Sequence, residues 1–203
     1  MAWDELALYG RLGLSHITDL GGYDHIVFVA ALTVAYGAAQ WRRLLVLVTA
    51  FTVGHSVTLA LATWQLVRVS SAVVETAIPV TIVATAVATI GSLAGRAEPV
   101  GGGPRPAMAW RYAMAGGFGL IHGLGFSGYL RSLLGSEVPV AAPLLAFNVG
   151  LELGQLAIVA VVLGAGTAVT RWTRMPERDW VLVMSGAAAG IATVMTFERA
   201  FGA

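Results

Sequence analysis

The chain has 203 residues, a formal net charge of +1, 57% hydrophobic residues and only 11% charged residues. Because soluble domains carry about 25% charged residues, this composition excludes a soluble domain and predicts an integral membrane protein. No basic run is present, which argues against a nucleic-acid partner, and the absence of cysteine excludes disulfides, thiolate zinc sites and iron–sulfur clusters.

Six apolar segments are long enough to cross a bilayer, since a spanning helix needs about 20 residues. They run over residues 23–40, 44–67, 72–94, 108–134, 140–169 and 179–201. The length leaves no room for a separate soluble domain. We therefore expect residues 1–203 to form a single all-α domain, a polytopic transmembrane helix bundle with about six spans.

The arginines predict the orientation of this bundle, because positively charged loops remain in the cytoplasm. The loops and span ends on one side hold eight of the 12 basic residues: Arg42, Arg43, Arg96, Arg105, Arg111, Arg171, Arg174 and Arg178. The opposite side holds only Arg11, Arg68, Arg131 and Arg199. Both termini are then expected on the outer side, in what we predict to be a bacterial inner membrane.

The first polar motif, HITDLGGYDHIVF, carries His16, Asp24 and His25 at the outer edge of the first span. Adjacent residues of a helix point about 100° apart, so Asp24 and His25 cannot both bind one ion from the same face. One can bind the ion while the other orients a ligand. The alternative is that Asp24 only caps the helix.

Two further histidines lie inside predicted spans. His55 belongs to FTVGHSVTLALA, where Thr52 shares its helix face and Ser56 follows it. His122 belongs to GGFGLIHGLGFSGYL, whose glycines allow a second helix, or a ligand, to come close. The alternatives are a hydrogen bond between helices for His55 and simple helix packing around His122.

The segment FNVGLELGQL places Asn148, Glu152 and Gln155 on one stripe of a single span. Amide and carboxylate groups in this pattern are hard to explain by packing, although a protonated or arginine-paired Glu152 is the alternative. Glu75 opens the third span near the outer surface, where solvation is easy. Together the polar groups form a funnel from the outer face to the middle of the membrane.

A charged group in the middle of a membrane helix costs roughly 2.5–3.5 kcal/mol, so such groups usually pair with an ion, a substrate or each other. Imidazoles and carboxylates suit a divalent first-row metal such as nickel, cobalt, zinc or iron. The predicted ligands are His16, Asp24, His25, His55, His122 and Glu152. The residues predicted to support them or to line the path are Thr52, Ser56, Asn148, Gln155 and Glu75.

The four motifs together resemble the HupE/UreJ family of small membrane proteins. The matching segments are HITDLGGYDHIVF, FTVGHSVTLALA, FGLIHGLGFSGYL and FNVGLELGQL, which lie between residues 16 and 156 in the order found in the family. The resemblance implies a multi-helix bundle for nickel or cobalt uptake, associated with hydrogenase and urease maturation. It also implies that the six predicted ligands are the polar positions of the family.

Three functions fit these observations. A permease would take a divalent cation from outside and pass it inward, and this is the function we favour. An intramembrane metal-dependent enzyme would activate water or oxygen against a lipid-like or membrane-embedded substrate; its catalytic residues are not identifiable from the sequence. A metal-sensing or assembly subunit would bind metal without flux or turnover. The expected partners are the metal ion and the lipid bilayer, while homo-oligomer formation stays open.

Overall fold

The computed structural model describes residues 3–93, 105–134 and 140–202. These residues form seven α-helices and one short 3-10 helix, with no strand among them, so the all-α prediction is confirmed. The elements are α1 (Trp3–Ile17), α2 (Asp24–Thr33), η1 (Ala38–Gln40), α3 (Trp41–Thr63), α4 (Ser71–Leu93), α5 (Arg105–Leu134), α6 (Ala141–Thr173) and α7 (Glu177–Phe201).

Four of the described helical segments are long and apolar enough to cross a membrane: Ala38–Thr63, Ser71–Leu93, Ala141–Thr173 and Glu177–Phe201. The predicted span 23–40 is different, because its α-helix has only 10 residues. Such a helix is about 15 Å long, half the thickness of the hydrocarbon core. Helix α5 has 30 residues but is not among these four segments.

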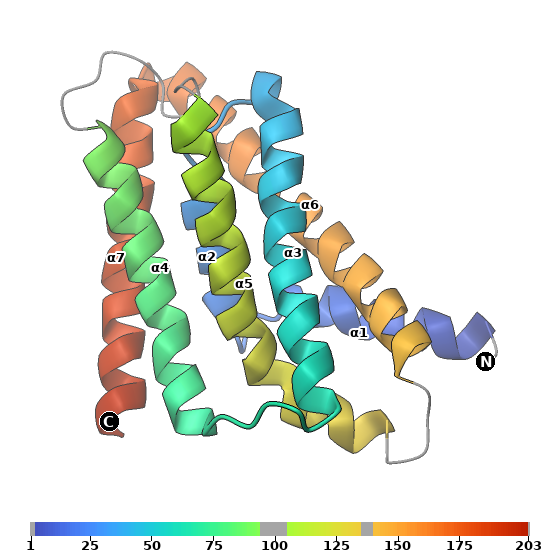
Figure 1. Cartoon of the computed structure of the whole chain (residues 1–203). Coiled ribbons are helices and arrows are strands. Elements are labelled where there is room, and N and C mark those ends of the chain that lie inside the picture. Colours follow the sequence, from blue (N-terminus) through green and yellow to red (C-terminus); the bar gives the residue numbers. More distant parts are fainter. Residues whose placement is uncertain (1–2, 94–104, 135–139, 203) are drawn as a thin grey trace.

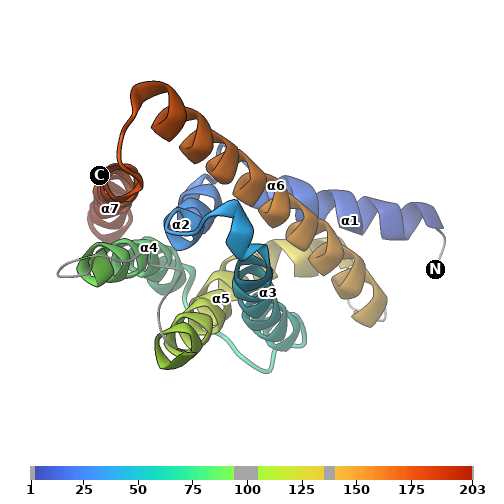
Figure 2. The same ribbon diagram turned by 90° about the horizontal axis from the view of Figure 1, so that it is seen from above.

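The short helix α2 occupies the centre of the molecule. Seen along the bundle, it is enclosed by α3, α4, α5, α6 and α7 (Figure 2). Most of its side chains are buried, including His25 and Phe28. A helix that stops partway through a membrane must have its free backbone ends covered by protein, and the surrounding helices provide that cover. Asp24 and His25, at the start of α2, therefore lie inside the bundle.

Glycines bring two pairs of helices into close contact, which the sequence analysis expected for the glycines around His122. A Cβ atom added to Gly123 of α5 would overlap the carbonyl oxygen of His55 in α3. A Cβ atom added to Gly150 of α6 would overlap the carbonyl oxygen of Gly10 in α1. The two contacts fix the helices that carry the central histidines, since backbones approach this closely only where side chains are absent.

Helix α1 has no counterpart among the predicted spans. It lies across the bundle at a steep angle to α3, α4 and α5 (Figure 1) and packs along the first half of α6. Ile17, at its end, is fully buried. This packing carries His16, in the last turn of α1, toward the middle of the molecule.

Candidate metal site

Three histidines from three different helices meet at one point. The possible ligand atoms of His16, His25 and His55 all lie within 4.8 Å of one another. Their ring centroids are 4.6 Å apart for His16 and His25, 5.9 Å for His16 and His55, and 6.1 Å for His25 and His55. His16 and His25 come from one sequence motif, whereas His55 comes from a distant segment, so the fold completes this group.

The nitrogens of these rings lack the partners that buried polar atoms usually have. Nε2 of His16, Nε2 of His25 and both ring nitrogens of His55 are buried without a hydrogen bond. His55 is completely buried and His25 is 5% exposed. Unpaired imidazole nitrogens that converge in this way fit a divalent transition metal, which takes the lone pair of a neutral ring.

His25 is held by a carboxylate on its far side. Its Nδ1 lies 2.9 Å from Oδ1 of Asp24, which also accepts the backbone N–H of His25 at 2.8 Å. An Nδ1–H donated to a carboxylate leaves Nε2 free to bind a metal, which is how metal-binding histidines are usually oriented. Asp24 lies outside the three-histidine group and contacts that group through His25.

The second oxygen of Asp24 is paired with an arginine that the sequence analysis did not select. Nη2 of Arg199 in α7 lies 2.9 Å from Oδ2 of Asp24, and Nη1 donates to the carbonyl oxygen of Glu75 at 3.0 Å. That carbonyl is available because Pro79, four residues later in α4, has no N–H to donate to it. The proline inside this membrane helix is the sequence feature that could have indicated the contact.

His122 lies beside the group but is bonded elsewhere. Its ring centroid is 5.0 Å from that of His25, and its Nε2 lies 2.9 Å from the hydroxyl oxygen of Thr81 in α4. Nδ1 of His122 is buried without a partner. The structure thus brings His122 next to the three-histidine group without including it, and its role as a ligand stays a prediction.

A cavity of about 320 Å³ leads to the rings of His16, His25 and His122. Its lining runs from Asp19, which is exposed, to His16, His25 and the fully buried His122. Glu75 and Arg199 also line it. The acidic groups give the cavity a surface that attracts cations. Glu75 lines this cavity, and its role along an ion path stays a prediction.

The predicted stripe on α6 forms a separate polar contact with α3. Oε1 of Glu152 accepts the hydroxyl of Thr49 at 2.6 Å, and Oε1 of Gln155 accepts that of Thr52 at 2.8 Å. Oδ1 of Asn148 is buried without a partner, and Ser56 bonds back to the carbonyl of Thr52. Glu152 does not join the three-histidine group, so its role as a ligand also stays a prediction.

His16 lies in α1, outside the candidate membrane spans. Burial, assisted by the neighbouring His25 and opposed by Asp24, lowers the pKa of His16 from 6.5 to about 3. The ring is therefore neutral at physiological pH. A neutral ring can offer its lone pair to a metal without first losing a proton.

The sequence of the chain matches the model of one protein family, described as HupE / UreJ protein, over residues 1–199. Comparison with curated proteins gave no match, and neither did comparison with solved structures. The match covers nearly the whole chain, including most of α1 and α7, which lie outside the four motifs.

Proposed function

The chain belongs to the HupE/UreJ family, and from this premise we propose that it is a permease for a divalent transition metal, nickel or cobalt, with His16, His25 and His55 as the central binding site. The observation that carries the proposal is the convergence of unpaired, buried imidazole nitrogens from α1, α2 and α3. Nitrogen ligands without thiolates suit nickel and cobalt as well as zinc and iron. The choice of nickel or cobalt rests on the family.

The ion reaches this site through the cavity that Asp19, Asp24 and Glu75 line. We place this half of the molecule on the outer side of a bacterial inner membrane, which agrees with the excess of arginines at the other ends of the helices. In this arrangement α2 and α5 complete six membrane segments, α2 reaching only partway, and both termini lie outside. Glu152 would act further along the path, or as an additional ligand.

A line of hydroxyl groups supports passage toward the inner side. Beyond His122, Thr81, Thr85 and Thr89 are all buried on α4 at intervals of four residues, on one helix face. Ser92 follows and accepts a hydrogen bond from Nη2 of Arg111 at 3.1 Å. Oxygen atoms in series offer weak, successive contacts of the kind that transport needs. Arg111, which is 8% exposed, closes the inner end in this conformation.

The test is metal binding and metal flux measured on the same preparation. Protein purified and reconstituted into liposomes should bind nickel or cobalt and import it down a gradient, followed by metal analysis of the vesicle lumen. His55→Ala should abolish both activities, because it removes one of the three imidazoles that form the site. Val57→Ala is the matched control, since Val57 lies on the same helix and is 45% exposed.

The two measurements separate permease from enzyme and sensor. Stoichiometric metal that remains bound without flux would reject the permease in favour of an intramembrane metalloenzyme or a sensing subunit. Absence of binding in the wild-type protein would reject the metal site itself.

A further inference from the structure

A second cavity is distinct from the one that leads to the metal site, and its lining contains more arginines than acidic residues. It has a volume of about 640 Å³ and lies between the end of α3, the start of α4 and the last turns of α5. Its polar lining comes from Gln65, Arg68, Ser71, Glu75, Ser127, Tyr129 and Arg131. This volume lies within the range of about 300–1,000 Å³ that small-molecule sites occupy.

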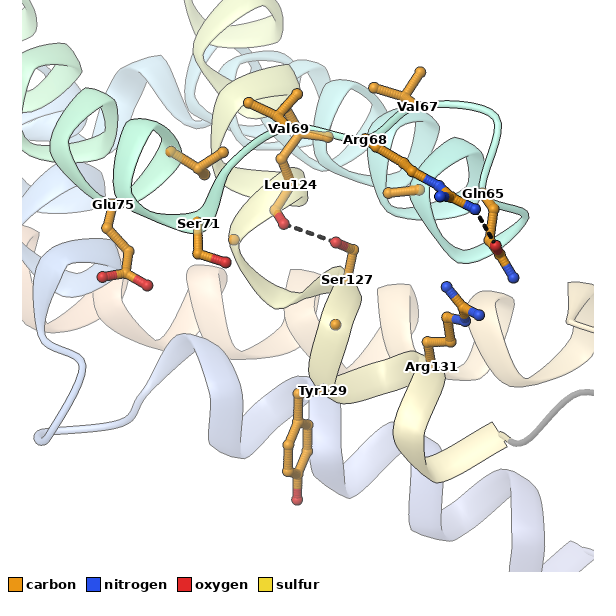
Figure 3. Close-up of a pocket in the computed structure, with 14 residues that line it drawn as sticks. Gln65, Val67, Arg68, Val69, Ser71, Glu75, Leu124, Ser127, Tyr129 and Arg131 are labelled. Carbon is orange, nitrogen blue, oxygen red and sulfur yellow. Dashed lines mark hydrogen bonds between the residues drawn. The ribbon is translucent and has the colours of Figure 1, made fainter.

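Two arginines from different elements define one end of this cavity. Figure 3 shows Arg68, from the connection after α3, and Arg131, from α5, extending toward the same end, whereas Glu75 lies at the other end. Nη2 of Arg68 donates to Oε1 of Gln65 at 2.6 Å. Within the described part of the chain, neither guanidinium has a carboxylate within ion-pair distance. Both guanidinium-bearing residues line the cavity.

The backbone around the cavity adds to this charge. Gln65 adopts φ 61°, which is uncommon outside glycine, and this left-handed residue turns the chain between the end of α3 and Arg68. Helix α4 begins at Ser71, so the positive end of its dipole lies at the same cavity. Hydroxyl groups of Ser71 and Ser127 are within the lining. Two guanidinium groups, hydroxyls and a helix start form a combination suited to the oxygens of a phosphate.

We propose that this cavity binds the phosphate group of an anionic molecule, next to the opening of the metal site. The two cavities share Glu75 and Gly125 in their linings, so they adjoin. Exposed apolar side chains flank the arginines, with Leu66 69% exposed and Val69 46% exposed. A lipid headgroup and a soluble phosphate present the same chemistry here, and the experiment distinguishes them.

The experiment has two arms on purified full-length protein in detergent. Native mass spectrometry compares retention of phosphatidylglycerol with retention of phosphatidylcholine, and calorimetry titrates inorganic phosphate. Wild-type protein should retain phosphatidylglycerol in preference to phosphatidylcholine, or bind inorganic phosphate, or both. The double variant Arg68→Gln, Arg131→Gln should bind that ligand at least about tenfold more weakly, because charge-assisted hydrogen bonds are lost.

Matched variants make the result specific to this cavity. Arg171→Gln with Arg174→Gln removes two exposed arginines at the other end of the bundle and should change nothing. Ser71→Asp places a carboxylate in the cavity at a position where aspartate favours a helix start, so the protein stays folded and anion binding falls. Binding of the lipid alone identifies a headgroup site, and binding of phosphate identifies a soluble ligand. No binding in either arm, or unchanged binding in the double variant, would overturn the proposal.

Discussion

Asp24 contacts two residues at once, the imidazole of His25 and the guanidinium of Arg199, and both contacts are 2.9 Å long. We expect Asp24→Asn to keep the shape of this contact but to lose the charge that fixes the His25 tautomer. Metal affinity should then fall by about 10–100-fold, as happens when the group that supports a ligand is changed. Calorimetric titration with nickel or cobalt measures the change.

Asp179→Asn serves as the control, since Asp179 is exposed at the start of α7. An Asp24→Asn protein that binds metal as tightly as Asp179→Asn would show that the carboxylate does not support metal binding.

Glu152 is a second carboxylate whose contribution can be measured. Glu152→Gln conserves the acceptor that Thr49 uses, so the contact between α3 and α6 should persist and the protein should remain folded. We expect metal binding to weaken modestly, because a negative charge near a buried cation stabilises it even without direct contact. Metal analysis of the purified variant tests this. Metal content equal to that of the wild type would remove Glu152 from the site.

At the scale of helices, the approach of α5 to α3 positions His55. We expect Gly123→Ala to destabilise the protein, since its new Cβ would overlap the carbonyl oxygen of His55 and the hydroxyl of Thr58. Overpacking of this kind costs about 1–3 kcal/mol. Thermal unfolding in detergent should show a lower melting temperature and reduced metal binding.

Gly117→Ala on the same helix is the matched control, because a Cβ there meets no atom within 4 Å. A similar loss of stability in both variants would mean that glycine in α5 serves the helix itself and not its contact with α3.

The sequence predicted the helical nature of the fold and four of the apolar spans but not α1 or the extent of α2. Apolar length identifies a spanning helix, and α1 lacks that length because it lies across the bundle. The prediction extended the first span to Gln40, whereas α2 ends at Thr33. Apolar side chains after Thr33 continue the hydropathy signal although the helix has ended.

The site was predictable in its residue types and not in its pairings. Histidines inside or at the edge of apolar segments are costly and so stand out, which is why His16, His25 and His55 were among the predicted ligands. The contact of Asp24 with Arg199 joins residues 175 positions apart, and no local spacing encodes it. Thr81, which bonds to His122, was missed because a single threonine in a helix most often bonds to its own backbone.

At the scale of the whole molecule, the row of buried hydroxyl groups on α4 allows metal binding and metal transport to be tested separately. We expect Thr81→Val to keep metal binding within a few-fold of the wild type, since Thr81 does not touch the three-histidine group. Flux should fall several-fold, because the bond to His122 and the first oxygen of the line are lost. Val80→Thr, at an exposed position of the same helix, is the control. Equal flux in both variants would place the inner path elsewhere.

The orientation of the whole bundle follows from its arginines and can be read directly from labelling. The natural chain has no cysteine, so a single introduced thiol gives no background. Trp172 is 86% exposed at the end of α6, and Leu20 is 82% exposed between α1 and α2. In cells treated with a membrane-impermeant maleimide, Leu20→Cys should be labelled at once and Trp172→Cys only after the membrane is opened. The reverse labelling pattern would mean that the bundle has the opposite orientation in the membrane. The acidic cavity would then face the cytoplasm, and the permease would export metal.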